Sequence, residues 1–336
     1  MNKIQFSRKD VNGNNISKDE LESWYDENNS ISGEIKTKLL DIIPKVEDNN
    51  AKELLMDIKN NVHDILLLTP ENLKKWADKI DNNYKDTLES IKINVPTGNS
   101  NIDKSLRTIL VETFNYTNYR KNKLVELAKK INVKTCPYCN MHYTLYAEEG
   151  KKNSEHLAKF QFDHFYNKDD YPMLSMSLYN LIPSCGICNQ SKSKKKLSLS
   201  FHPYHSYISK QFKFELNNPI NLYIGAKTND LIDVNFIATD SDKQSDLDVF
   251  VKTFHLKALY QRHGDIARET FDKAYEYPYY SNQNNFNWLI DKSSDYLKRL
   301  WFGTYMNEDE IEKRPMTKFI QDLAKQAKYR HITSKK

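Results

Sequence analysis

Residues 160–192 read FQFDHFYNKDDYPMLSMSLYNLIPSCGICNQSK, and this stretch decides how the centre of the chain folds. Its first part, Phe160 to Phe165, alternates apolar and polar residues, which predicts a short strand that ends in the pair Asp163-His164. The stretch then passes through Asn180-Leu181-Ile182-Pro183-Ser184 into a turn, Cys185-Gly186-Ile187-Cys188. A compact unit of short strands and tight turns is therefore expected here.

A second cysteine pair, Cys136-Pro137-Tyr138-Cys139, precedes this stretch, and the two pairs use all four cysteines of the chain. Two residues between thiolates allow one tight turn to present both sulfurs to a tetrahedral zinc ion, at roughly 2.3 Å each. In a reducing compartment, paired cysteines are metal ligands more often than disulfides. The spacing predicts a closed, structural Zn²⁺ site, and four unrelated buried thiols are the alternative. The predicted ligands are Cys136, Cys139, Cys185 and Cys188.

The order of the polar residues inside this cysteine frame is informative. Asp163-His164, then Asn180-Leu181, then Asn189 with Lys192 three residues later resembles the motif of the HNH endonucleases, the ββα-metal nucleases. The likeness is to the variety whose last motif position is Asn, and to the zinc-braced branch of the family. It covers Cys136 to Lys192.

The resemblance implies a division of chemical roles. His164 would be the general base, since a neutral imidazole with a pKa near roughly 6.5 can take a proton from water at cellular pH. Asp163 and Asn189 would be oxygen ligands of a catalytic Mg²⁺ or Mn²⁺ ion. Asn180 would hold the loop behind His164 in place. Because neighbouring residues of a strand point to opposite faces, Asp163 and His164 can share a direction only if the strand end bends.

Lysines are concentrated at the end of this unit and after it. Six lysines and one acidic residue, Glu215, lie between residues 181 and 220, a local excess of +5 that equals the net charge of the whole chain. A basic patch on an otherwise neutral protein is typical of a surface that binds a polyanion. A solvated lysine-rich turn is the alternative. We expect phosphate contacts from Lys192, Lys194 and Lys195. Many HNH nucleases carry a Pro-Lys-Ser segment shortly after the His, where this chain has Asp169 and Asp170. The substrate-side loop therefore departs from the family pattern.

The flanking regions favour helices. Thr69-Pro70-Glu71 is typical of a helix start, and the turn formers from 94 to 99 predict a break. An amphipathic stretch over 106–131 carries several basic residues between 120 and 130, to which we assign no chemistry. The predicted fold class is α+β. It comprises a helical N-terminal region (1–134), an HNH nuclease module with a four-cysteine zinc site (135–210), and a mostly helical C-terminal region with a few strands (211–336).

The chain has no apolar run long enough for a membrane helix and no signal peptide at its start, so we expect a cytoplasmic protein. Its layout resembles the HNH nuclease subunits of Septu-type bacterial anti-phage systems. That resemblance implies DNA as substrate, a role in antiviral defence and an ABC/SMC-type ATPase partner. The helical flanks are expected to bind this partner or a second copy of the chain. The alternative is a nucleic-acid-binding or ATPase-interacting subunit with a degenerate HNH site.

Overall fold

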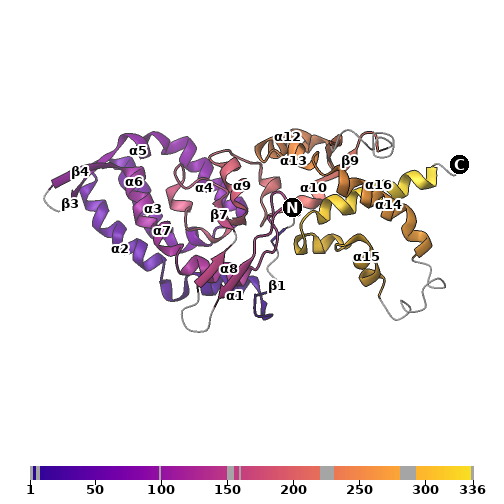
Figure 1. The fold of residues 1–336 in the computed structure, drawn as a ribbon. Coiled ribbons are helices and arrows are strands. Elements are labelled where there is room, and N and C mark those ends of the chain that lie inside the picture. The colour runs from indigo at the N-terminus through magenta and orange to yellow at the C-terminus, as the bar shows by residue number, and fades with distance from the viewer. Residues whose placement is uncertain are drawn as a thin grey trace.

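The computed structural model describes residues 3–4, 8–97, 100–149, 155–158, 160–219, 231–280 and 293–333. Helices and small sheets are mixed, as the α+β prediction requires, and within these ranges every sheet consists of two antiparallel strands. Figure 1 shows the N-terminal helices on the left and the C-terminal helices on the right, with β7 and α9 between them. The cysteine-framed stretch therefore lies where the two helical parts meet.

The N-terminal part is built from helices whose apolar stripes face inward. α3 has its N-cap at Asp48, whose carboxylate accepts from Ala51 N at 2.7 Å, and seven of its residues, mostly Leu, Ile and Val, are buried. α1 begins with a capping box between Ser17 and Glu20. The helices are α1 (Lys18–Tyr25), α2 (Ser32–Ile42), α3 (Asn49–Leu66), α4 (Pro70–Asn83), α5 (Lys85–Ser90), α6 (Leu106–Phe114), α7 (Tyr116–Tyr119) and α8 (Lys123–Ile131).

Two local predictions need correction in this part. The segment 94–99 does interrupt the helices, but its residues up to 97 belong to a hairpin, β3 (Lys92–Thr97) with β4 (Ser100–Ser105); residues 98–99 lie outside the described residues. The amphipathic stretch 106–131 is three helices instead of one. Asn115 ends α6 in the left-handed conformation, with φ of 48°, and turns the chain toward α7.

The central part contains the predicted strand and the helix that follows the second cysteine pair. β7 (Gln161–His164) pairs with β8 (Leu181–Ser184), and His164 lies opposite Leu181 in the register. α9 (Gly186–Lys192) follows at once, with Cys185 as its N-cap. A second hairpin, β5 (Tyr146–Glu149) with β6 (Glu155–Ala158), precedes β7. Two hairpins therefore lie between the cysteine pairs, and α9 follows the second of them.

The C-terminal part combines one hairpin with helices. β9 (Phe212–Leu216) pairs with β10 (Val234–Ala238), in the region where a few strands are expected. His255, whose φ is 53°, separates the helix that ends at Thr253 from the helix that begins at Leu256. The helices are α10 (Ile208–Gln211), α12 (Gln244–Thr253), α13 (Leu256–Tyr260), α14 (Gly264–Tyr280), α15 (Ser294–Phe302) and α16 (Thr317–Thr333).

One continuous cluster of buried apolar side chains runs through the N-terminal helices, the cysteine turns and the C-terminal helices. It crosses both predicted boundaries, at 134/135 and 210/211, which remain predictions. Among the described residues, no helix combines the length and apolar character needed to cross a membrane.

Candidate functional site

The four cysteines form one compact cluster. Their sulfur atoms all lie within 4.8 Å of one another and all four side chains are buried. The sulfurs of Cys139 and Cys185 are 3.9 Å apart. A tetrahedral ion with bonds of roughly 2.3 Å would hold its sulfur ligands about 3.8 Å apart. Both turns therefore contribute to a site that can hold a metal ion such as zinc.

Local backbone geometry orients the sulfur atoms toward the interior of the cluster. Cys185 Sγ accepts from Cys188 N at 3.4 Å, and Cys139 Sγ accepts from Met141 N at the same distance. Asn140, just after the first pair, has a φ of 52°, a conformation that asparagine tolerates well. Burial alone would raise the pKa of Cys136, but hydrogen bonds from the other three thiols lower this pKa well below its usual range. A thiolate is the form that binds metal ions.

The first cysteine turn is also joined to the C-terminal part. The buried Asn140 side chain donates to Ile311 O at 3.0 Å and accepts from Lys318 N at 3.1 Å. Tyr260 OH donates to Cys139 O at 2.6 Å. These bonds reach residues more than a hundred positions away in the sequence, so the cluster connects distant parts of the chain.

His164 lies at the end of β7 with a nearly buried ring, 9% exposed. Its Nε2 is 3.0 Å from Ser175 O, and the Tyr116 ring meets the imidazole edge-on at a centroid distance of 4.5 Å. A carbonyl oxygen only accepts, so Nε2 carries the ring proton and Nδ1 carries the lone pair. Burial lowers the pKa of His164 to about 3. The ring is therefore neutral at cellular pH.

The Asp163 side chain contacts other residues than those around His164. Its carboxylate accepts from Tyr138 OH at 2.7 Å and lies 3.5 Å from Lys192 Nζ. Burial raises the pKa of Asp163, and Lys192 opposes this shift. Tyr138 is one of the two residues between Cys136 and Cys139, so a single hydrogen bond joins the cysteine turn to β7.

Lys192 does not occupy the surface position that the sequence suggests. Its side chain is fully buried, and its ammonium donates to His164 O at 2.7 Å. Burial lowers its pKa, while the Asp163 carboxylate raises it. The expected phosphate contact of Lys192 is replaced by a structural one, because its ammonium faces the interior. Lys194 and Lys195 are exposed, and Lys194 lies 3.4 Å from the carboxylate of Asp169.

The two asparagines of the motif form hydrogen bonds near opposite ends of β7. Asn180 is buried; its Oδ1 accepts from Tyr166 N at 2.7 Å, and its Nδ2 donates to Leu174 O at 2.8 Å. Leu174 precedes the Ser175 whose carbonyl contacts the imidazole, so Asn180 fixes the loop beside His164. Asn189 is half-buried on α9, and its Nδ2 donates to Gln161 Oε1 at 2.6 Å.

Asp163, His164 and Asn189 line one cavity of about 630 Å³. The cations Arg120 and Lys168 line it too, and no carboxylate of a described residue forms an ion pair with either of them. Lys168 lies 5.3 Å from the Tyr116 ring centroid. Other polar residues of the lining are Tyr116, Gln161, Asn167 and Ser193. No role was predicted for Tyr116, Arg120 or Lys168 from the sequence; the one signal was the basic run that includes Arg120.

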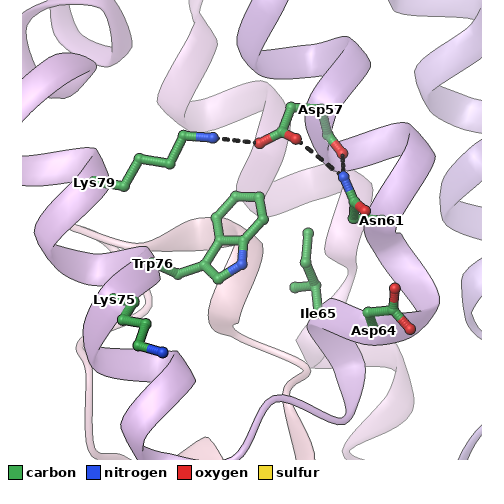
Figure 2. A pocket seen from close by; sticks show the side chains of 7 residues that line it. All are labelled: Asp57, Asn61, Asp64, Ile65, Lys75, Trp76 and Lys79. Carbon is green, nitrogen blue, oxygen red and sulfur yellow. Dashed lines mark hydrogen bonds and ion pairs between the residues drawn. The ribbon is translucent and has the colours of Figure 1, made fainter.

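A smaller cavity of about 290 Å³ lies between α3 and α4 (Figure 2). There, Asp57 accepts hydrogen bonds from Lys79 at 2.7 Å and from Asn61 at 3.0 Å. Lys79 also lies 5.0 Å from the Trp76 ring centroid. Asp57 and Lys79 thus neutralise each other, and neither a histidine nor a cysteine lines this cavity, so we assign it no catalysis.

No protein-family model, curated protein or solved structure matches the chain.

Proposed function

We propose that the chain is a metal-dependent endonuclease of the HNH type, which hydrolyses phosphodiester bonds in DNA. His164 is the general base, and Asp163 and Asn189 hold a Mg²⁺ or Mn²⁺ ion. One observation carries the proposal: a neutral imidazole, two oxygen-donor side chains and two cations line the same cavity, and no described carboxylate forms an ion pair with either cation. A buried neutral base, hard oxygen ligands and cations are the groups that phosphodiester hydrolysis requires.

The backbone around this cavity supports the proposal. β7 pairs with β8 after a connection that contains two short 3-10 helices, and α9 follows β8 directly. Asp163 and His164 lie on β7, and Asn189 lies on α9. The cysteine cluster frames the same segment, and we assign Zn²⁺ to it as a structural ion. Four thiolates leave no coordination position for water, so this ion would take no part in the reaction.

The hydrogen bonds of His164 suit a base. With its proton on Nε2, held at Ser175 O, the ring offers the Nδ1 lone pair to a water molecule. Burial keeps the ring neutral, and a phosphate anion in the cavity would raise the pKa of His164 toward its usual value. Arg120 and Lys168 would bind that phosphate and balance the charge that develops on it.

The residues present fit a hard cation. The Asp163 carboxylate has about four lone-pair sites, of which the hydroxyl of Tyr138 and the ammonium of Lys192 occupy two. Asn189 Oδ1 accepts no hydrogen bond from the described residues. When bound, Mg²⁺ or Mn²⁺ supplies charge that stabilises the phosphate and the leaving oxygen. Asp163 and Asn189 would hold and orient it.

The biological setting follows from the resemblance to anti-phage nuclease subunits. We propose that the chain acts in the cytoplasm as the effector nuclease of a bacterial defence system, and that an ABC/SMC-type ATPase is its partner. Co-purification with such an ATPase tests this part separately from catalysis.

Cleavage of supercoiled plasmid in Mg²⁺ or Mn²⁺ tests the enzyme proposal. A general base contributes about 10²- to 10⁴-fold, so His164→Ala should slow cleavage by that factor. His263→Ala, which removes a half-buried histidine that does not line the cavity, is the matched control and should cut like the wild type. Equal rates for His164→Ala and the wild type would exclude His164 as the base.

A second candidate function has one observation in its favour. The Asp163 carboxylate already has Tyr138 and Lys192 as partners, and this arrangement also suits a degenerate site that binds nucleic acid or an ATPase without cutting. Tight DNA binding without cleavage in either metal, alone and with the partner, would favour this alternative.

A further inference from the structure

The turn between α7 and α8 separates two cavities. Arg120 lines the cavity of His164. Lys121 and Lys123 line a neighbouring cavity of about 540 Å³. Val125, on the first turn of α8, lines both, so the two cavities lie on either side of this residue. The basic run around residue 120, for which no role was predicted, thus borders both cavities.

The charge along this path is positive. Arg120 and Lys121 are exposed, and no carboxylate of a described residue forms an ion pair with either of them. The acidic residue of the second cavity, Glu126, is paired with Lys129 at 2.7 Å. The nearby Glu34 is paired with Lys38 at 2.6 Å and accepts the hydroxyl of Tyr119. Glu126 and Glu34 are therefore both paired, whereas Arg120 and Lys121 have no ion-pair partner among the residues that the structure describes.

Aromatic rings accompany these cations. Tyr116 lines the first cavity, and Trp24 and Tyr119 line the second. Lys123 Nζ donates to Trp24 O at 2.8 Å and lies 3.9 Å from the Trp24 ring centroid, which fixes α1 beside α8. Cations that follow a backbone, interleaved with aromatic rings, are the usual surface for unpaired nucleotides, because every base has a π-face.

We propose that a single strand of nucleic acid leaves the His164 cavity across the α7–α8 turn and continues into the second cavity, with Arg120 and Lys121 on its phosphates. This inference rests on the proposed function, since it takes the His164 cavity as the cleavage site. It deepens that function by naming the substrate class: unpaired strands, or duplexes with a frayed or displaced strand.

Salt-dependent binding of a labelled oligonucleotide of about 16 nucleotides tests this path without requiring cleavage. The measurement uses the full chain, without Mg²⁺ or Mn²⁺, and follows fluorescence anisotropy. Loss of one phosphate contact lowers the slope of log K against log salt by about 0.7 for a single strand. Lys121→Gln should therefore show that smaller slope and weaker binding. Lys252→Gln, which neutralises an exposed lysine on α12, should match the wild type.

Three outcomes separate the two proposals. An unchanged slope for Lys121→Gln, or tighter binding of a duplex than of its single strand, overturns the path. A reduced slope in a protein that cleaves nothing upholds the path and refutes the nuclease. In an active protein, Lys121→Gln should slow cleavage of the long strand, whereas Lys252→Gln should cleave it at the wild-type rate.

Discussion

Replacing Lys192 with methionine should destabilise the fold by about 3 to 5 kcal/mol, the usual cost of removing one partner of a buried ion pair. The side chain of Lys192 is 0% exposed and that of Asp163 is 4% exposed. The substitution keeps most of the apolar stem but removes the charge that faces the Asp163 carboxylate. It also leaves His164 O without the donor that now lies 2.7 Å away.

Two contributions add up to the loss of stability expected for Lys192→Met. A hydrogen bond to a charged group contributes about 1.5 to 3 kcal/mol, and an unpaired buried carboxylate adds its own desolvation cost. Lys194, two residues further on, is the matched control. Its side chain is 58% exposed and lies 3.4 Å from Asp169, so Lys194→Met should cost no more than about 1 kcal/mol.

Urea unfolding followed by far-UV circular dichroism measures both variants. If the loss in Lys192→Met comes from the unpaired carboxylate, the double variant Asp163→Asn/Lys192→Met should recover part of it, since a neutral amide is cheaper to bury than a charge. A loss below about 1 kcal/mol for Lys192→Met would refute the reasoning, because it would mean that the ammonium is solvated like that of Lys194.

Three other changes test the remaining contacts. Cys136→Ser should lose the bound metal, measured by elemental analysis, and unfold the central unit, because structural zinc contributes folding free energy directly; a folded, metal-free variant would contradict this. Tyr138→Phe removes the hydroxyl bonded to Asp163 and should cost about 1.5 to 3 kcal/mol in urea unfolding, whereas Tyr143→Phe, at a ring that is 47% exposed, should cost almost nothing. Burial lowers the pKa of His202 from 6.5 to about 3, so the unfolded chain binds one more proton between these values. The free energy of unfolding should therefore fall as the pH drops from 6.5 toward 3, by about 1.4 kcal/mol per pH unit from this group. His202→Gln should lose that part of the slope, and an unchanged slope would show that the ring is solvated.

The features that local sequence could predict are those that depend on a few neighbouring residues. A Cys-x-x-Cys turn positions its own two sulfurs, and the completeness of the pairing indicated that both turns meet, which the cluster confirms. Alternation over 160–165 predicted the strand that became β7. The pattern of Phe212 to Leu216 likewise coincides with β9.

The features that the sequence missed depend on tertiary packing. Lys192 ends a short helix among other lysines, so the sequence predicts an exposed side chain. Only the tertiary fold places its ammonium beside Asp163. Tyr116, on α7, and Arg120, directly after this helix, lie some forty residues before β7. The amphipathic pattern did not separate α7 from its neighbours. Asn115, in the left-handed conformation, makes that separation, and asparagine adopts this conformation too rarely to be predicted there.

The cysteine cluster and the His164 cavity are coupled through very short connections. Asn189 directly follows Cys188 on α9, and Tyr138, between the first two cysteines, donates to Asp163. Each of the two side chains that we propose as Mg²⁺ ligands is therefore one peptide bond or one hydrogen bond from a cysteine turn. A metal ion that fixes both turns would also fix the separation of these ligands, which a two-stranded hairpin alone cannot hold rigidly. The structural metal would then be required for cleavage although it does not contact the substrate. Loss of this metal should therefore abolish cleavage before the flanking helices unfold.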